Sequence, residues 1–438
     1  MKFVFGFVGS GAGANFLIDN IIKNKELFKR SIIHIYEKYP YPFGLIRTGI
    51  APDHQKAKIL IKKFSENIIQ NNKQIEYFGN CNINNILTLK NHYSAIILSN
   101  GAQRDNLLNI PGEKLKYVYS SRNISNWYNC GIDSKKIEIN KFNNNLVIIG
   151  NGNVSLDIAR ILGTRSINEL DKLDINRKRL AEINSIKKGI KNILIVARRG
   201  IEHSAFSTKQ IRAFCALGKK NNWSINIDEK ELKSVSTINH LQREVKRKID
   251  VIKKNTNITK IDYSNFSHYL EKTKNNIFFL YNYKPIKIEF GENTKTNSII
   301  FIKNEKNGKR QLKINTGLII KSIGVNNGNI SPNYFQIPGI YKVGWASTNG
   351  KGQINKTLQN SLSAYTKLLN DIKNGTIKSK PSVNREYIKK TILKSNKSQK
   401  ILSFEDWLKI DQYEREMGKL LGKEREKLLT KEEMLELI

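Results

Sequence analysis

The amino-acid sequence predicts an α/β fold built from two parallel-sheet units. A strand, a glycine-containing turn and a helix follow one another in "FVFGFVGSGAGANFLIDN" and again in "LVIIGNGNVSLDIARIL". Each stretch is followed by a further strand-like segment, "SIIHIYEK" and "NILIVARRG". A strand that leads into a helix and then a parallel strand begins a doubly wound sheet, so we expect two Rossmann-like dinucleotide-binding domains. The length of 438 residues accommodates two to three domains.

The composition restricts the class of protein. A net charge of +37 attracts nucleic acid, anionic membranes or acidic proteins, although Lys is abundant throughout and a general compositional bias also explains the excess. Cys81, Cys130 and Cys215 form no C-x-x-C pair, which argues against a disulfide framework, a thiolate metal site or a redox dithiol. We therefore expect no metal site and a reducing compartment. No apolar run reaches the roughly 18 residues of a membrane span, and no targeting peptide precedes the first strand as the sequence is written. A removed presequence stays possible.

The first glycine turn has the pattern G-x-G-x-x-A, with Gly9, Gly11 and Ala14. The first glycine allows a tight turn, the second lets the backbone approach a pyrophosphate, and the alanine permits close helix–strand packing. Glu37 closes the next strand, where a carboxylate accepts hydrogen bonds from a ribose 2′-hydroxyl and repels a 2′-phosphate. This pattern predicts FAD or NAD binding. The alternative for Glu37 is an exposed acid at a strand end.

The second turn contains Gly150 and Gly152, with Ser155 at the third position. Its next strand ends in Arg198 and Arg199 instead of an acid. Two guanidinium groups at this position suit a 2′-phosphate through bidentate, charge-assisted hydrogen bonds. Adjacent basic residues also occur by chance in so basic a chain. The simplest assignment is FAD in the first unit and NADP(H) in the second.

The other elements are predicted more coarsely. Apolar residues at helical spacing (Ile59, Leu60, Phe64 and Ile68) predict a helix over residues 54–71. The segment "PFGLIRTGIAPDH", residues 42–54, is expected to be an irregular, extended loop. Between residues 219 and 316 short strands such as "IKIEF" and "SIIFIK" are expected. The tail, residues 404–438, is expected to be helical, and its alternating charges are typical of a solvated docking helix.

Together these segments resemble the adrenodoxin reductase family. The resemblance is carried by "EKYPYPFGLIRTGIAPDH", "GNGNVSLDIARIL", "ARRG" and "VGWA", and it extends through "VYSSRNISNWYNCG" to the tail. Many flavoproteins with two dinucleotide domains have Gly-Asp at this position. This chain has Gly344-Trp345 instead, and the adrenodoxin reductase family also has Gly-Trp there. The absence of C-x-x-C likewise sets the disulfide reductases aside.

The resemblance implies an NADPH-dependent, FAD-containing ferredoxin reductase. In that family hydride passes from NADPH to FAD, and single electrons then pass to a small, acidic [2Fe–2S] ferredoxin. It also implies an NADP domain (residues 106–322) inserted in an FAD domain (residues 1–105 and 323–438, the second part including the helical tail). A mitochondrial location, a monomeric state and possible peripheral membrane association follow by resemblance alone, and no nucleic-acid partner is expected.

The resemblance also assigns site residues. The positions that match the family's flavin site, besides Gly9, Gly11 and Glu37, are Gly13, Leu45, Ile83, Trp345, Gly352, Gln353 and Ile354. Those that match its NADP site are Asn151, Gly152, Asn153, Val154, Arg198, Arg199 and Gln210. His54 and Asp157 match the catalytic positions near the nicotinamide–flavin contact, and Arg212 is a candidate ferredoxin contact. Structural alternatives are a packed residue at a helix start for His54 and a helix-dipole carboxylate for Asp157.

Two departures and two further functions have to be considered. Gln210 stands where the family has a glutamate, so the charge and any acid/base role at this position are lost. The loop after Trp345, "ASTNGKGQI", replaces an Arg-Gly-Pro-Thr run. The alternative functions are an FAD/NADPH oxidoreductase of the same architecture with another acceptor, such as a diaphorase, and a basic binding protein on a retired flavin fold.

Overall fold

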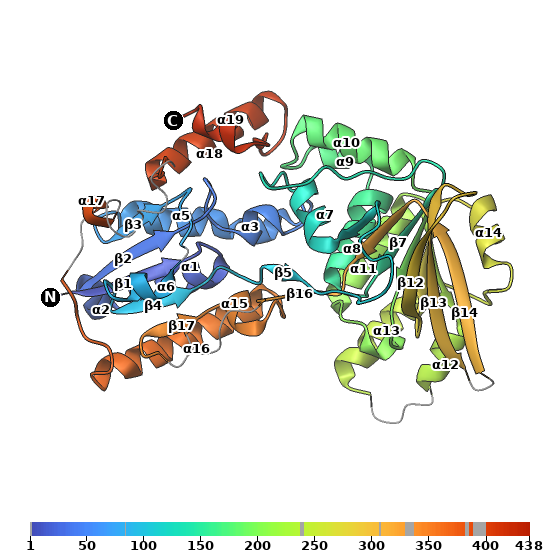
Figure 1. The fold of residues 1–438 in the computed structure, drawn as a ribbon, viewed down its shortest axis with the longest axis horizontal. Helices are drawn as coiled ribbons and strands as arrows, with labels where there is room; N and C mark the ends of the chain where they lie inside the picture. Colours follow the sequence, from blue (N-terminus) through green and yellow to red (C-terminus); the bar gives the residue numbers. More distant parts are fainter. Residues whose placement is uncertain are drawn as a thin grey trace.

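The computed structural model contains two parallel β-sheets that lie side by side along the long axis of the molecule (Figure 1). It describes residues 2–83, 85–236, 241–305, 308–328, 337–381, 385–388 and 400–438. The two sheets and their flanking helices confirm the predicted α/β class. Within the described residues, no helix has both the length and the apolar character that crossing a bilayer requires.

The first sheet is entirely parallel. Its strands, in spatial order, are β17 (Ile340–Lys342), β4 (Ala95–Leu98), β1 (Phe3–Val8), β2 (Ser31–Tyr36) and β3 (Ile75–Phe78). The associated helices are α1 (Ala12–Lys23), α2 (Lys25–Lys29), α3 (Leu45–Thr48), α4 (Gln55–Lys58), α5 (Leu60–Gln70), α6 (Ile86–Lys90), α15 (Trp345–Thr348), α16 (Ile354–Lys373) and α17 (Arg385–Tyr387). From β1 the chain passes to β2 on one side, and β4 pairs on the other. The switch point where such sheets bind ligands is therefore at the carboxyl end of β1.

The second sheet repeats this plan. In spatial order its strands are β10 (Asn257–Thr259), β9 (Ser224–Asp228), β11 (Asn276–Leu280), β8 (Asn192–Val196), β7 (Asn145–Ile149), β15 (Leu318–Lys321) and β6 (Val118–Ser120). Its helices are α7 (Ser121–Tyr128), α8 (Asn153–Ala159), a π-helical turn η1 (Arg160–Thr164), α9 (Ile167–Asp171), α10 (Arg177–Lys188), the 3₁₀ turn η2 (Ile201–His203), α11 (Thr208–Lys220), α12 (Glu229–Ser236), α13 (Arg243–Asn255) and α14 (Phe266–Lys272). Its switch point lies at the carboxyl end of β7, between β8 and β15.

Two smaller sheets complete the strands. An antiparallel sheet of β12 (Lys284–Gly291), β13 (Thr296–Glu305) and β14 (Gly308–Thr316) covers one face of the second unit. β5 (Arg104–Asp105) pairs with β16 (Val325–Asn326) where the chain enters and leaves the second unit, and both strands lie between the two large sheets in Figure 1. Because β17 follows the whole second unit in sequence yet pairs with β4, the second unit is inserted in the first, as expected.

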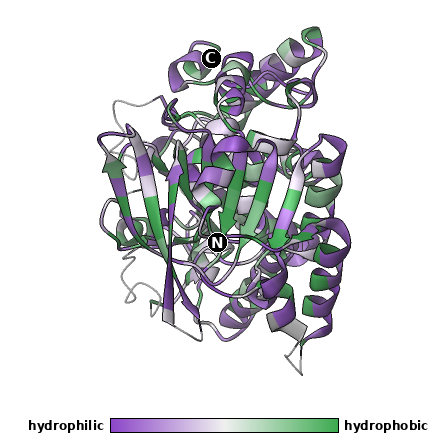
Figure 2. Cartoon of the chain, turned by 90° about the vertical axis from the view of Figure 1, so that its right-hand side faces the viewer, coloured by the Kyte–Doolittle hydropathy of each residue, from purple (hydrophilic) through white to green (hydrophobic). Residues whose placement is uncertain are grey.

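The hydrophobic core lies mainly in the strands. Figure 2 shows hydrophobic residues concentrated along the sheets and hydrophilic residues on the outer helices. Every residue of β1, β4, β7, β8 and β11 is buried. Strands of a parallel sheet that is covered on both faces read as continuous apolar runs, which is why β1, β7 and β8 could be predicted from the sequence.

Two predicted segments have a different local structure. The expected helix over residues 54–71 is divided into α4 and α5 at Ile59, which is 66% exposed. Lys58 takes the buried position instead, since its ammonium group reaches Asp174 in the second unit at 2.6 Å. The segment of residues 42–54 is less extended than expected, because Gly44, at φ +48°, starts the helical turn α3.

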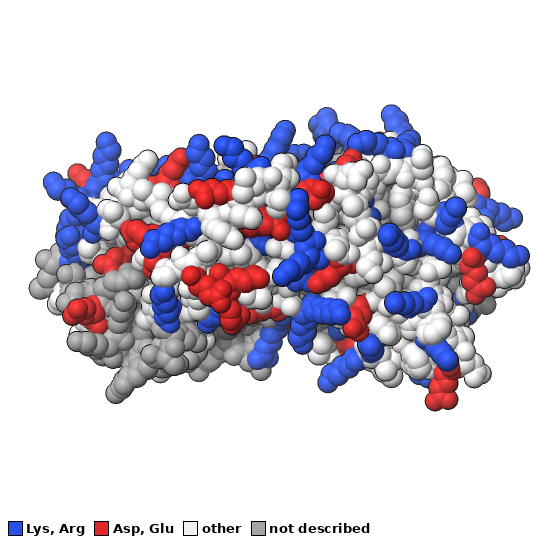
Figure 3. Space-filling view, turned by 90° about the horizontal axis from the view of Figure 1, so that it is seen from above, with Lys and Arg blue, Asp and Glu red and all other residues white. Residues whose placement is uncertain are grey.

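The C-terminal tail forms two helices, α18 (Phe404–Leu420) and α19 (Lys431–Leu435). It is divided because the chain doubles back on α18: a Cβ atom at Gly418 would lie 2.5 Å from the Cα atom of Arg425. The expectation of a solvated helix is correct only for the outer face. This face belongs to a surface on which Lys and Arg are spread along the molecule with Asp and Glu between them (Figure 3).

The inner face of the tail carries buried charges that contact both units. Glu414 accepts hydrogen bonds from Arg47 at 2.6 Å and from Arg425 at 2.7 Å. Although burial raises the pKa of Glu414, the two guanidinium groups hold it below its ordinary value. Lys427 lies 2.8 Å from Asp174 of the second unit. The tail therefore fixes the first unit, through Arg47, and the second unit, through Asp174, to one another.

We expect Glu414→Gln to lower the free energy of unfolding by about 3–5 kcal/mol, because it leaves two buried guanidinium groups without their counter-charge. Urea-induced unfolding followed by tryptophan fluorescence measures this loss. Glu416→Gln, an exposed change on the same helix, is the matched control and should stay within about 0.5 kcal/mol of the parent protein. Equal stabilities of the two variants would contradict the role given to the tail.

Candidate functional site

The three glycines of the first turn are required for different reasons. Gly9 has φ +97°, and a Cβ atom there would lie 2.7 Å from the carbonyl oxygen of Ser99. A Cβ atom at Gly13 would lie 2.9 Å from the backbone nitrogen of Gly344, so helix α1 packs directly on that loop. At Gly11 the nearest atom would be 3.7 Å away, an ordinary contact. The fold therefore requires Gly9 and Gly13, whereas Gly11 leaves backbone open to a ligand.

Glu37 is a buried brace at this turn, since its side chain is only 6% exposed. One carboxylate oxygen accepts hydrogen bonds from the backbone nitrogen and hydroxyl group of Ser10, at 3.0 and 2.7 Å, and the other accepts from the backbone nitrogen of Tyr39 at 3.2 Å. Burial raises the pKa of Glu37, although these hydrogen bonds act in the opposite direction. The alternative of an exposed strand-end acid does not describe this residue. Each carboxylate oxygen keeps acceptor capacity for a ribose hydroxyl.

Residues from distant segments surround the first turn. Leu45 begins α3 and is 45% exposed. The indole nitrogen of Trp345 donates to the carbonyl oxygen of Gly352 at 3.0 Å, which holds the altered loop closed before α16. Gly352 and Gln353 are exposed, while Ile354, the first residue of α16, is partly buried.

Ile83 lies on the loop after β3, which is held beside Glu37 because the backbone nitrogen of Cys81 donates to the Glu37 carbonyl oxygen at 2.8 Å. Its side chain is partly buried and packs against an apolar cluster that includes Tyr36 and Phe78. The structure thus brings Ile83 to the same edge of the sheet as the glycine turn.

The second turn has the same construction. Gly150 has φ +122°, and a Cβ atom there would lie 2.1 Å from the carbonyl oxygen of Ser322, whereas a Cβ atom at Gly152 would have its nearest neighbour 4.0 Å away. The amide nitrogen of Asn151 donates to the hydroxyl group of Ser204 at 3.0 Å, and the side-chain oxygen of Asn153 accepts from the backbone nitrogen of Ser207 at 2.9 Å.

The groups expected to recognise NADP are accessible beside this turn. Val154 is 36% exposed at the start of α8. Arg198 and Arg199 are both exposed and begin one residue after the end of β8. Neither arginine makes an ion pair among those found in the described part of the chain, so both guanidinium groups are available to an anion.

His54, Asp157 and Gln210 come together from three separate segments. His54 precedes α4 in the first unit, Asp157 lies on α8, and Gln210 lies on the first turn of α11. The Nε2 atom of His54 is 3.2 Å from an oxygen of Asp157 and 3.2 Å from the amide nitrogen of Gln210. The His54 side chain is 30% exposed, so one side of the ring remains open.

The sequence analysis missed three residues that hold this group: Asp53, Arg160 and Arg165. Arg160 is 2% exposed, and one of its terminal nitrogens, Nη2, lies 2.8 Å from Asp157, 2.9 Å from Asp53 and 2.9 Å from His54 Nε2. Arg165 donates to Asp53 at 3.0 Å. Although burial raises the pKa of Asp53, the hydrogen bond and charge of Arg160 hold it below its ordinary value. The spacing of Asp157 and Arg160, three apart on one helix face, was the available signal.

Both turns present features that fit a bound dinucleotide. Three buried acceptor oxygens, from the side chains of Asn100, Asn151 and Gln210, have no hydrogen-bond partner within the described residues. Asn100 comes shortly after β4 and its backbone packs against Gly9. Asn151 lies in the second turn, and Gln210 lies beside His54. Since buried polar atoms in native proteins are nearly always satisfied, these acceptors indicate where ligand or solvent donors bind.

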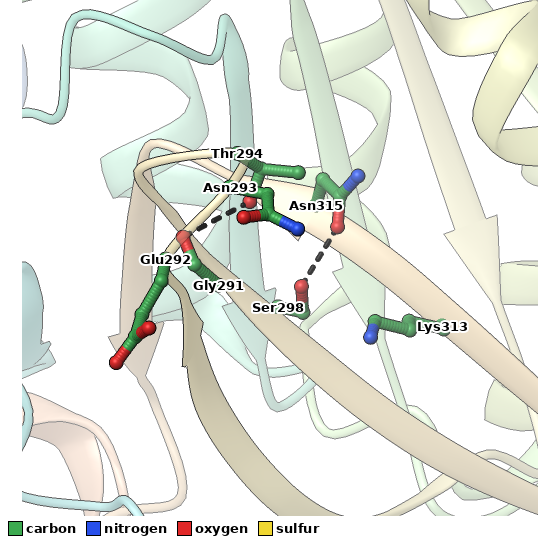
Figure 4. A pocket seen from close by; sticks show the side chains of 7 residues that line it. All are labelled: Gly291, Glu292, Asn293, Thr294, Ser298, Lys313 and Asn315. Atoms are coloured by element: carbon green, nitrogen blue, oxygen red, sulfur yellow. Dashed lines mark hydrogen bonds between the residues drawn. The ribbon is translucent and has the colours of Figure 1, made fainter.

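Two hollows elsewhere on the surface differ from these turns. One, at the turn between β12 and β13, is lined by Gly291, Glu292, Asn293, Thr294, Ser298, Lys313 and Asn315 (Figure 4). Its polar groups bond one another, as in the 2.7 Å contact between Ser298 and Asn315. The second lies between α11 and α13 and is strongly basic, with Lys209, Arg212, Arg243, Arg247 and Lys254 in its lining. No cluster of His, Cys, Asp and Glu that could hold a metal ion occurs in the described residues.

Comparison with known proteins shows similarity over almost the whole chain. No protein-family model matches the chain. The mitochondrial NADPH:adrenodoxin oxidoreductase of Bos taurus is 29% identical over 459 residues, covering 98% of this chain and 91% of that protein. The Arabidopsis thaliana protein of the same name is 27% identical over 98% of this chain and 94% of that protein. The solved structure of Mycobacterium tuberculosis FprA in complex with NADPH has a TM-score of 0.84 and 25% identity, covering 100% of this chain and 99% of that chain.

The chain is thus similar to the adrenodoxin reductase family over almost its whole length. The two departures noted in the sequence have definite places in the structure. Gln210 contacts His54 directly, and the altered loop after Trp345 is closed by the indole hydrogen bond. The first departure thus bears on the histidine itself, and the second on the packing of the loop that precedes α16.

We expect Gly11→Ala to reduce the flavin content of the purified protein strongly, because a methyl group there would occupy the approach to a pyrophosphate. The melting temperature of the flavin-free protein should be nearly unchanged, since the methyl group meets no protein atom closer than 3.7 Å. Absorbance at visible wavelengths and differential scanning fluorimetry measure the two effects. Gly13→Ala is the contrasting variant and should lower the melting temperature as well. A fully flavinated Gly11→Ala protein would contradict this assignment.

Proposed function

We propose that this protein is an FAD-dependent NADPH:ferredoxin oxidoreductase that delivers single electrons to a [2Fe–2S] ferredoxin. The observation that carries the proposal is the meeting of His54, from the loop of the first nucleotide unit, with Asp157, from the helix of the second glycine turn, at 3.2 Å. This contact supports a site in which the reactive ends of two dinucleotides, one on each unit, would meet beside the same histidine.

The first unit, residues 1–105 and 323–438, would hold FAD. Gly9, Gly11 and Gly13 admit the pyrophosphate, and Glu37 accepts from the adenosine ribose. Leu45, Trp345 and the segment 352–354 contribute backbone and apolar surface for the flavin, with Ile83 on the Glu37 side. FAD, when bound, accepts a hydride and can release its two electrons one at a time.

The second unit, residues 106–322, would hold NADPH. The turn formed by residues 151–154 receives the pyrophosphate, and Arg198 and Arg199 bind the 2′-phosphate. Asp157 and Gln210 flank His54 and close the site around the nicotinamide end. Excluding water there and keeping the reacting groups in one orientation is the main contribution that a protein makes to hydride transfer.

The basic hollow between α11 and α13 suits an acidic ferredoxin. Five of the ten residues that line it are Lys or Arg, against the two acids Glu244 and Asp250. It begins within one turn of Gln210, because Lys209 and Arg212 lie on the same helix. An acidic partner docked there would be steered by charge to the end of the molecule at which the electrons leave.

A mitochondrial location is the remaining part of the proposal. It rests on the names of the relatives from cattle and Arabidopsis thaliana, both called mitochondrial. The strongly basic surface is compatible with transient encounters between this protein and a soluble electron carrier.

Titration of the purified protein with NADPH tests the proposal directly. We expect flavin absorbance that bleaches on reduction, faster with NADPH than with NADH. Arg198→Ala/Arg199→Ala should raise the KM for NADPH by about 10–100-fold, the loss of one or two charge-assisted hydrogen bonds, and leave the KM for NADH unchanged. A protein that lacks flavin, or equal rates with both nucleotides before mutation, would argue against the proposal.

Arg243→Ala/Arg247→Ala tests the docking surface. We expect ferredoxin-dependent cytochrome c reduction at low ionic strength to fall by about tenfold or more, with a weaker dependence on salt, because steering charge is removed. Ferricyanide reduction by NADPH should be unchanged, since both arginines lie on α13, outside the residues assigned to the two dinucleotides. Lys62→Ala/Lys73→Ala, a change of equal charge at exposed positions of the first unit, is the control. Equal losses in the two double variants would show that only the overall charge matters.

A further inference from the structure

The Nε2 atom of His54 is surrounded mainly by hydrogen-bond donors. Arg160 Nη2 lies 2.9 Å away and the Gln210 amide nitrogen 3.2 Å away. A guanidinium group can only donate, and it cannot lose its proton in a protein. A ring nitrogen that faced it with a hydrogen atom would place two hydrogens against each other. With two donors directed at it, Nε2 presents its lone pair, which puts the ring proton on Nδ1.

The one acceptor near Nε2 does not reverse this assignment. Asp157 lies 3.2 Å from Nε2, but its oxygen is also 2.8 Å from the same Arg160 nitrogen. Nη2 of Arg160 has two hydrogens. One is directed at Asp53, and the other is shared between Asp157 and Nε2 of His54, so the contact between Asp157 and His54 is that of two acceptors on one N–H group.

The positive and negative charges around the His54 ring balance, so the direction of the hydrogen bonds decides which ring nitrogen carries the proton. Two carboxylates face two guanidinium groups. The carboxylates belong to Asp53, next to His54 in the loop, and to Asp157 on α8. The guanidinium groups belong to Arg160, the first residue of η1, and to Arg165, directly after η1. From α11 only the uncharged Gln210 faces the ring, and from α7 the buried hydroxyl group of Tyr128 lies behind the carboxylates and bonds Ser125.

The position of Arg160 is itself fixed. It is buried, and it binds both oxygens of Asp53, whose side chain is 3% exposed. The π-helical turn η1 begins at Arg160 and follows directly on α8, the helix that carries Asp157. A π-turn of this kind frequently marks a functional site. The guanidinium group is therefore held beside Nε2.

We propose that Arg160 is the positioning residue that sets the tautomer of His54, with Gln210 as the second donor, so that His54 offers Nδ1–H to the bound substrate. Nδ1 has no hydrogen-bond partner within the described residues, and the ring is open on one side. Under the proposed function His54 thus acts as an oriented hydrogen-bond donor. The inference depends on that function only for the identity of the substrate, because the tautomer can be measured without NADPH.

The test is a long-range ¹H–¹⁵N correlation spectrum of the flavin-loaded protein at pH 8 without NADPH, with the His54 signals identified by their loss in His54→Gln. We expect the Nδ1–H tautomer with an unprotonated Nε2. Arg160→Lys, which keeps the charge beside Asp53 but not the reach to Nε2, should give a mixture of tautomers and about tenfold slower flavin reduction by NADPH. A proton on Nε2 in the parent protein, or an unchanged tautomer in Arg160→Lys, would overturn the proposal.

Gln210→Glu is a second variant that does not disturb the buried ion pairs. It replaces the donor at Nε2 with a carboxylate acceptor, so we expect a proton to appear on Nε2. Gln359→Glu, on the exposed face of α16, makes the same chemical change elsewhere and should leave the His54 spectrum as it was. If Gln210→Glu kept an unprotonated Nε2, Gln210 would have no part in setting the tautomer. If flavin reduction failed in every protein while the tautomers behaved as expected, the proposed function alone would be wrong.

Discussion

The site depends on one buried ion pair, Arg160 with Asp53, which joins the two nucleotide-binding units. Both side chains are almost fully buried. Because an ion left alone in such surroundings costs several kcal/mol, neither partner can withdraw without the other. The loop that ends in His54 and the helix that carries Asp157 are therefore held together, although more than one hundred positions separate them in the sequence. A second set of buried charges, in which Asp174 meets Lys58 and Lys427, supports the same junction from the tail side.

Much of the fold could be predicted because its signals are local. The glycine turns, the buried parallel strands and the acid or basic residues at their ends all lie within short stretches, and the structure places Glu37 and the Arg198–Arg199 pair just after their strands. The roles of Gly9 and Gly11 followed from the motif, whereas the packing of Gly13 and Gly150 could not be predicted. This packing depends on which distant backbone approaches each turn, such as Gly344 at Gly13 and Ser322 at Gly150.

The buried charges were not predictable from the sequence in the same way. In a chain with 75 Lys and Arg residues, nothing marks Arg160, Lys427 or Arg425 as buried before their partners are known. The tail illustrates the problem, because its alternating charges have the composition of a solvated helix. Glu414 nevertheless occupies a fully buried position between two arginines. Burial of a charged residue is decided by tertiary partners, and a sequence pattern reports only the average expectation.

The insertion of one unit into the other also determines the order in which the protein can fold. β4 is in place early in the chain, but its outer neighbour β17 follows the entire second unit. At the usual pace of synthesis this edge waits for on the order of tens of seconds with unpaired backbone groups. The second unit takes all seven strands of its parallel sheet from one continuous stretch and can be finished first. The arrangement that unites two nucleotide sites in the mature molecule thus leaves the nascent chain with an open sheet edge that chaperones or folding rate must protect.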